Sequence, residues 1–239
     1  MNKYKLTRFI DKYHLGGNVN AVVINSKSDK LSTRFITGDK ALLGELSMDN
    51  WTFEDSELGV YDTEQLSRLL GVLDDDVTLN LTSSGDKAIS VEISDALSKV
   101  NFMLSDKSVI NTPPALKQIP EFQIEIKVDS NFIQRFISGK SALPDTDTFT
   151  VISDDDGVKL VIGYSSINTN RVTIPVETTE HSNIQNVSFN ANLFKDVLVA
   201  NKECESATLY VSEQGLSKIN FTVDDYDATY YLVAVQDVD

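Results

Sequence analysis

Apolar and polar residues alternate in the same way in two segments that lie half a chain apart. Residues 76–95 overlay residues 206–225 without a gap, and a Gly stands at the same place in both, as Gly85 and Gly215. The alternating apolar positions are Leu79, Leu81, Ile89, Val91 and Ile93 in the first segment and Leu209, Val211, Ile219, Phe221 and Val223 in the second. Each segment therefore predicts a β-hairpin with one buried face.

A short amphipathic helix is predicted just before each hairpin. Asp62 and Asn190 are N-cap residues, and apolar residues follow each at the i, i+3, i+4 spacing of one helix face. These positions are Leu66, Leu69 and Leu70 in the first half and Phe194, Val197 and Leu198 in the second. A further pair of helices opens the two halves, where residues 9–13 overlay residues 132–136. Strands are expected to follow at 20–25 and 148–153.

The chain thus contains the same pattern twice, which is the mark of an internal repeat. Each half reads as a helix, three or four strands, a second helix and three strands, an α+β arrangement. Three of the five prolines (Pro113, Pro114 and Pro120) fall between the halves and predict a stiff linker. We expect a first domain at 1–110, a linker at 111–120 and a second domain at 121–239.

Composition narrows the class of protein. Of 239 residues, 41% are hydrophobic and 24% are charged, which is typical of a globular chain. A lone cysteine, Cys204, excludes a disulfide framework, and His14 and His181 add too few ligands for a structural zinc site. No apolar run is long enough for a transmembrane helix, and no secretory signal is visible. We expect a cytoplasmic protein, in the host cytoplasm if the source is viral, with no membrane partner.

The net charge, taken alone, argues against a nucleic-acid partner. The chain has 21 Lys and Arg residues and 36 Asp and Glu residues, which gives a formal net charge of −15. The distribution of that charge changes the interpretation. Basic residues gather on the predicted helices, whereas the acidic ones fill turns such as 74–76, 154–156 and 224–225. Helices on one side of the sheets would form a positive surface, which attracts phosphates without reading base sequence.

Several segments resemble the DNA polymerase sliding clamps, a family that includes proliferating cell nuclear antigen, the bacterial β clamp and the T-even phage clamp. The resemblance of the second half rests on residues 189–198, 215–223 and 230–235, which follow the order of the nuclear-antigen C-terminal domain. Residues 59–62 and 69–75 are closer to the phage clamps. Through the domain repeat, the resemblance spans essentially the whole chain.

This resemblance implies a DNA clamp fold of two repeated domains, each with sheets outside and two helices on the inner face. Two domains per chain imply a homotrimeric ring that encircles duplex DNA and tethers the replicative polymerase, sliding without sequence specificity. It implies DNA, polymerase and a clamp loader as partners, and no cofactor. By position, the DNA-facing residues would be Lys5, Arg8, Lys12, Arg68, Arg135, Lys140, Lys195 and Lys202.

The family also suggests where partners bind. Polymerase and loader peptides bind sliding clamps beneath the interdomain linker, which here points to the apolar residues Val109, Ile110, Leu116, Val233 and Val235. Subunits join head to tail through edge strands, which suggests residues 98–105 of one chain against 170–176 of the next. Such a heterologous interface closes a ring when the rotation fits.

The residues offer no catalytic arrangement. Gly16-Gly17 follows a helix and lacks the Lys-Ser/Thr of a phosphate-binding loop. Ser84-Gly85 is a hairpin turn without the helix of a nucleophile elbow, and residues 154–157 lack the ligand spacing of a calcium loop. We therefore expect no enzyme and no metal. A non-catalytic acidic interaction scaffold or DNA mimic is the alternative that the −15 charge leaves open, and a hydrolase has almost no support.

Overall fold

The structure is a computed structural model that describes residues 2–85, 87–116, 118–167 and 169–235. The chain forms two compact units. The first comprises Met1–Gly38, Gly44–Pro114 and Asp224–Ala228, and the second comprises Asp39–Leu43, Ala115–Val223 and Thr229–Asp239. The turn around Asp224 and Asp225 is therefore part of the first unit, although most of the surrounding sequence belongs to the second.

The first half of the chain contains two α-helices separated by four strands. Its elements are α1 (Lys3–His14), η1 (Leu15–Gly17), β1 (Val22–Lys27), β2 (Lys30–Ile36), β3 (Leu42–Met48), β4 (Ser56–Val60), α2 (Thr63–Leu70), β5 (Thr78–Ser84), β6 (Lys87–Ser94), β7 (Lys99–Met103) and η2 (Lys107–Val109). The strand order is β3-β2-β1-β4 in one sheet and β5-β6-β7 in another, with the pairs β1–β2, β1–β4, β5–β6 and β6–β7 antiparallel.

The second half repeats this order with additions. Its elements are β8 (Ile124–Asp129), α3 (Ser130–Ala142), β9 (Thr148–Asp154), β10 (Gly157–Ile162), β11 (Val172–Pro175), β12 (Thr178–His181), β13 (Val187–Asn190), α4 (Ala191–Ala200), β14 (Ser206–Val211), β15 (Leu216–Val223) and β16 (Tyr226–Val233). The strand orders are β12-β8-β14-β15-β16 and β11-β10-β9-β13. Five strands separate α3 from α4, so the expected three or four is wrong here. The extra strand is β12, which pairs with β8.

Local sequence signals account for the matching elements. The Asp62 carboxylate accepts from the Gln65 N–H at 2.9 Å, and the Asn190 side chain accepts from Asn192 and Leu193, which confirms both N-caps. Gly85 and Gly215 have φ angles of 59° and 81° in the hairpin turns, a left-handed conformation that Gly adopts without strain. The predicted strand at 20–25 begins and ends two residues late, as β1, whereas the strand at 148–153 is β9.

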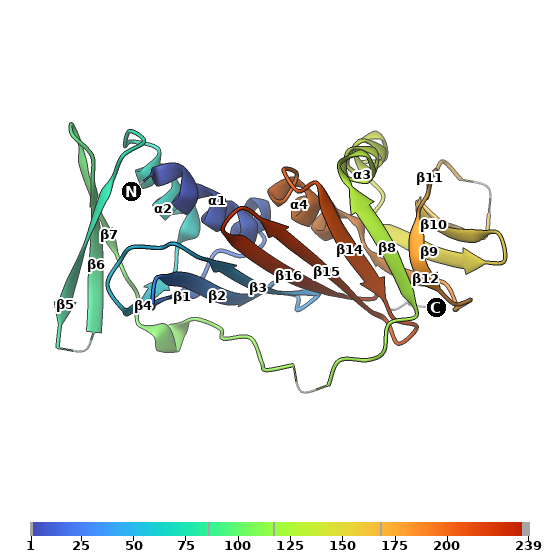
Figure 1. Ribbon diagram of the computed structural model, residues 1–239, viewed down its shortest axis with the longest axis horizontal. Coiled ribbons are helices and arrows are strands. Elements are labelled where there is room, and N and C mark those ends of the chain that lie inside the picture. Colours follow the sequence, from blue (N-terminus) through green and yellow to red (C-terminus); the bar gives the residue numbers. More distant parts are fainter. Residues whose placement is uncertain (1, 86, 117, 168, 236–239) are drawn as a thin grey trace. The chain divides into compact units, whose positions relative to one another are not determined.

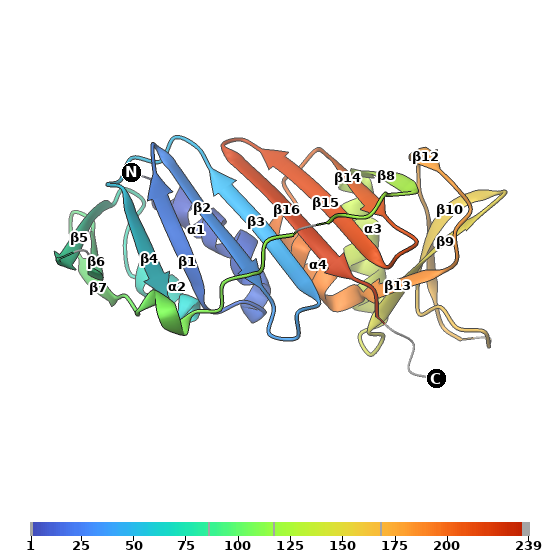
Figure 2. The same cartoon turned by 90° about the horizontal axis from the view of Figure 1, so that it is seen from below.

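In each unit a pair of helices packs on one face of the sheet (Figures 1 and 2). In the first unit Tyr13 is fully buried, and its ring lies 6.0 Å from Phe9 and 6.3 Å from Phe35 of β2, between ring centroids. The Tyr13 hydroxyl is 3.1 Å from the Thr63 hydroxyl, and burial raises its pKa. The buried faces of α1 and α2 are therefore fixed, and so are the faces they leave to solvent.

Candidate nucleic-acid interface

The four α-helices carry charge of the opposite sign to the chain as a whole. They hold eight Lys or Arg against three Asp or Glu, whereas the full chain holds 21 against 36. Helix α1 alone contributes Lys3, Lys5, Arg8 and Lys12 against Asp11. The helices are thus the part of each unit with the strongest electrostatic attraction for phosphate.

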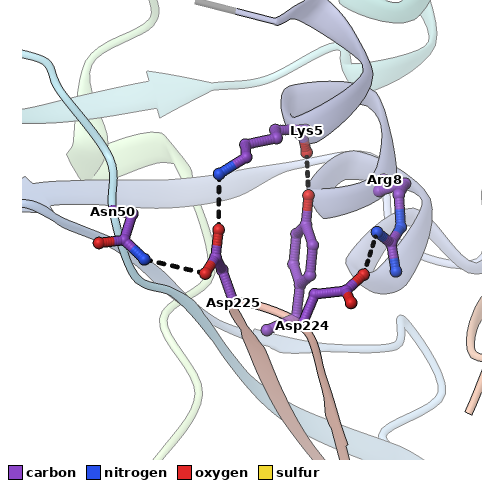
Figure 3. A network of polar contacts seen from close by, with 6 residues as sticks. Lys5, Arg8, Asn50, Asp224 and Asp225 are labelled. Carbon is purple, nitrogen blue, oxygen red and sulfur yellow. Dashed lines mark hydrogen bonds and ion pairs between the residues drawn. The ribbon is translucent and has the colours of Figure 1, made fainter.

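On α1, two of these basic residues are held by neighbouring carboxylates (Figure 3). The Lys5 ammonium lies 2.5 Å from an Asp225 carboxylate oxygen, and the Arg8 guanidinium donates to Asp224 at 2.8 Å. Asp224 and Asp225 form the turn between β15 and β16. The hydrogen bond from Lys5, followed by one from the Asn50 amide, holds the pKa of Asp225 below its usual value.

An aromatic residue of the same turn fixes Arg8 further. The Arg8 guanidinium lies 4.6 Å from the centroid of the Tyr226 ring, and the Tyr226 hydroxyl donates to the Lys5 carbonyl at 2.8 Å. Burial raises the pKa of Tyr226 to about 12, against the opposing effect of the Arg8 charge. The Arg8 side chain is 16% exposed and that of Lys5 is 41% exposed, so both still reach solvent.

Two of the expected DNA-facing residues are buried. Lys12 is 1% exposed, and its ammonium lies 5.5 Å from the centroid of the Tyr226 ring. Lys140 is 3% exposed, and its ammonium donates to the Leu143 carbonyl at 3.3 Å and the Pro144 carbonyl at 2.9 Å. The predicted solvent exposure of Lys140 is wrong because its side chain turns back to satisfy carbonyls beyond the end of α3.

The other expected basic residues are exposed or half-buried, on the helices or just after one. Arg68 pairs with Glu64 one helical turn earlier, and Arg135 donates to the neutral Asn131 side chain at 3.2 Å. Lys195 is half-buried on α4. Lys202 is exposed but follows the end of α4 rather than lying on it. These four, with Lys5 and Arg8, are the expected residues whose charge is accessible.

The apolar residues expected to bind partner peptides divide between the units. In the second unit Leu116, Val233 and Val235 are exposed, and backbone bonds fix the last two, from Val233 to Ala41 and from Val235 to Ser188. In the first unit Val109 is exposed, but Ile110 is 5% exposed. Ile110 packs into its own unit and leaves little surface for a ligand.

Two strands expected at subunit contacts lie at sheet edges. β7 ends the order β5-β6-β7, and β11 ends the order β11-β10-β9-β13. Hydrogen-bonded pairs alternate along an antiparallel ladder. The Leu104 N–H donates to the Ile89 carbonyl, so Asn101, three residues earlier along β7, is at a position whose backbone groups point away from β6. The Val176 N–H donates to the Val158 carbonyl, so the backbone groups of Thr173 on β11 likewise point away from β10. Both edges thus present unpaired backbone donors and acceptors within the described ladders.

No local motif in the sequence indicates the contacts that hold α1. Asp224 and Asp225 read as ordinary turn acids, and their partners on α1 are about 220 residues away in the chain. A local motif cannot encode a pairing of that separation. The acidic character of residues 224–225 follows from the sequence, whereas their position against α1 follows from the tertiary fold.

No group of three metal-ligating side chains occurs among the described residues. Residues 154–157 connect β9 to β10 as a turn, as expected, and Cys204 is buried, with its thiol donating to the Ser206 carbonyl. None of the described helices has the length and apolar character needed to cross a lipid bilayer.

Two units, each with a pair of helices on antiparallel sheets, give the chain the fold of the sliding clamps. The chain is similar to proliferating cellular nuclear antigen from Entamoeba histolytica, with a TM-score of 0.76 over 99% of this chain and 97% of that one, at 16% identity. It is also similar to a chain of the PCNA2–PCNA3 complex from Sulfolobus tokodaii, with a TM-score of 0.71 over 98% and 97%, at 14% identity. No protein-family model and no curated protein sequence matches the chain.

Proposed function

We propose that this protein is a DNA polymerase processivity factor, a ring that encircles duplex DNA and tethers the replicative polymerase. The observation that carries the proposal is the clamp fold along almost the whole chain. The reversed charge of the four helices supports it independently. In this role the protein performs no catalysis and needs no cofactor, and it works where the DNA is replicated, in the cytoplasm, or in the host cytoplasm if the source is viral.

The DNA contacts would come from the accessible basic residues of the helices and the turn after α4. These are Lys5, Arg8, Arg68, Arg135, Lys195 and Lys202. Lys and Arg attract phosphates through salt-screened electrostatics that carry no base specificity. A sliding ring needs contacts of this kind, because tight local binding would stop its movement. The acidic remainder of the chain would repel DNA and so limit unproductive binding elsewhere.

The ring would be a homotrimer, because six domains close a clamp and each chain supplies two. We infer that β7 of one chain adds to β11 of the next. Both are edge strands, and the backbone groups of Asn101 on β7 and Thr173 on β11 point outward. Such a contact uses two different surfaces, so every chain offers one of each and the assembly can close.

Peptides of the polymerase and of a clamp loader would bind the second unit at its exposed apolar residues. Leu116, Val233 and Val235 are each more than a third exposed, and exposed apolar surface of this kind marks interaction sites when it is contiguous. An apolar peptide anchor buried there would bind through the hydrophobic effect while the DNA-facing helices stay unoccupied.

The test is polymerase processivity with a matched pair of variants. The first variant replaces Arg68, Arg135, Lys195 and Lys202 with Ala. The control replaces four exposed lysines outside the helices, Lys27, Lys30, Lys87 and Lys127. We expect the wild type and the control to lengthen the product made per polymerase binding event, and the helix variant to lose this effect with its fold intact. An equal effect of both variants, or no stimulation by wild type, would favour an acidic interaction scaffold.

A further inference from the structure

The turn between β15 and β16 gives each of two α1 cations its own carboxylate. Asp224 and Asp225 are adjacent in sequence, and Lys5 and Arg8 lie three residues apart, on neighbouring positions of one helix face. The two ion pairs therefore form side by side (Figure 3). Arg135 on α3 differs, since its side chain donates to the neutral Asn131 amide oxygen.

The turn is held against α1 by contacts that do not need these carboxylates. The Tyr226 hydroxyl donates to the Lys5 carbonyl at 2.8 Å, and the Tyr226 side chain is buried. The Asp49 N–H donates to the Asp225 backbone carbonyl at 2.9 Å. Asp224 has a φ of 52°, a left-handed conformation that both Asp and Asn tolerate. Replacing either Asp with Asn should therefore leave the turn in place while removing its charge.

We propose that Asp224 and Asp225 act as built-in counter-ions that weaken the contact of Lys5 and Arg8 with the phosphates of duplex DNA. The inference rests on the proposed clamp function. A phosphate that approaches either cation must compete with a carboxylate already 2.5 to 2.8 Å away. The contact between the cation and the phosphate then contributes less binding free energy, and fewer counter-ions are released from the DNA on binding. The turn thus keeps the most basic helix from gripping DNA, which favours sliding.

The decisive variant is the double replacement Asp224→Asn with Asp225→Asn, and Asp29→Asn is its control. Asp29 lies in the β1–β2 turn of the same unit, and its φ of 59° is close to that of Asp224. The measurement is the salt dependence of binding to a linear duplex of mixed sequence. Each Lys or Arg that becomes free to neutralise a phosphate steepens the slope of log K against log salt by up to about 0.9. The slope of the double variant should therefore be steeper by up to about 1.8 per chain.

Four outcomes separate the possibilities. A steeper slope in the double variant, with the control unchanged, supports the inference. A slope equal to that of Asp29→Asn overturns it, and so does a shallower slope with a lowered melting temperature, which indicates a purely structural role. A wild type that shows no salt-dependent DNA binding would instead contradict the proposed function itself.

A second pair of variants keeps the inference testable if the double variant fails to fold. In the wild-type background, Lys5→Ala and Arg135→Ala are compared. Because Lys5 is paired with a carboxylate and Arg135 with a neutral amide, Lys5→Ala should reduce the salt slope by clearly less. Equal reductions would show that the carboxylate does not weaken the contact, and would overturn the inference.

Discussion

Phe136 of α3 and Phe194 of α4 meet edge to face, with ring centroids 4.8 Å apart and ring planes at 89°. Both rings also contact Phe149 of β9, at 5.2 and 4.9 Å. This cluster joins the two helices of the second unit to each other and to a sheet beneath them. Arg135, which precedes Phe136 on α3 and is exposed, is thereby held at a fixed place on the helix with respect to α4.

Phe194→Ala should lower the free energy of unfolding by about 3–5 kcal/mol, because it removes a fully buried ring and leaves a cavity. Val199→Ala on the same helix is the control, and it should change that free energy by no more than about 0.5 kcal/mol, because Val199 is exposed. Denaturant unfolding measures both. A loss of less than about 1 kcal/mol for Phe194→Ala would mean that the aromatic cluster does not hold the helix pair.

The burial of Lys140 separates stability from DNA contact on one helix. Lys140→Met should cost about 1–3 kcal/mol, because the carbonyls of Leu143 and Pro144 lose their donor. It should leave the salt slope of DNA binding unchanged. Arg135→Ala should show the opposite behaviour, with stability within about 0.5 kcal/mol of wild type and a slope reduced by up to about 0.9. A reduced slope for Lys140→Met would restore Lys140 to the DNA-facing set.

The Lys5–Asp225 pair should give stability a pH dependence of known sign. The pKa of Asp225 lies below its usual 3.8 in the folded protein, so the folded state favours the charged form. Its contribution is complete above pH 3.8 and is lost as the pH falls through the lower folded value. The melting temperature of wild type should therefore exceed that of Asp225→Asn at pH 7, and this difference should shrink below pH 3.8. A difference that grows with acidity would contradict the assignment.

The edge of β7 allows the subunit contact to be tested without disturbing the fold. Asn101→Pro removes a backbone N–H that points away from β6, so the β6–β7 ladder keeps its bonds. If β7 pairs with a neighbouring chain, this variant should be a monomer in light scattering. Asn101→Thr keeps the donor and should assemble as wild type does. An unchanged assembly of the Pro variant would place the interface elsewhere.

Local signals were sufficient for most of the fold. The helix caps at Asp62 and Asn190 depend only on residues close to them in the chain, and so do the glycines at the left-handed turn positions 85 and 215. The sequence therefore predicts all four. The internal repeat then predicts that a helix and a hairpin follow one another in both halves. The additional strand β12 was missed because its four residues, Thr178–His181, are largely polar and exposed and carry no alternating apolar pattern.

The candidate site was harder to predict, for a physical reason. A helical projection places Lys5, Arg8 and Lys12 on one sector of α1, but it does not show what covers that sector. Tyr226 lies over Arg8 and close to Lys12, and its position depends on the folding of β15 and β16. The burial of Lys12 and the ion pairs of Lys5 and Arg8 with Asp225 and Asp224 thus arise from tertiary contacts. The sequence of α1 alone cannot predict them.

The most direct measurement of the central claim asks whether the protein is linked to DNA topologically. A linear duplex is tethered at one end, the protein is allowed to thread over the other, and that end is then blocked. A closed ring should survive a high-salt wash that screens phosphate contacts, and should leave when the duplex is cut between the block and the tether. Release by salt alone, with the end still blocked, would contradict the account.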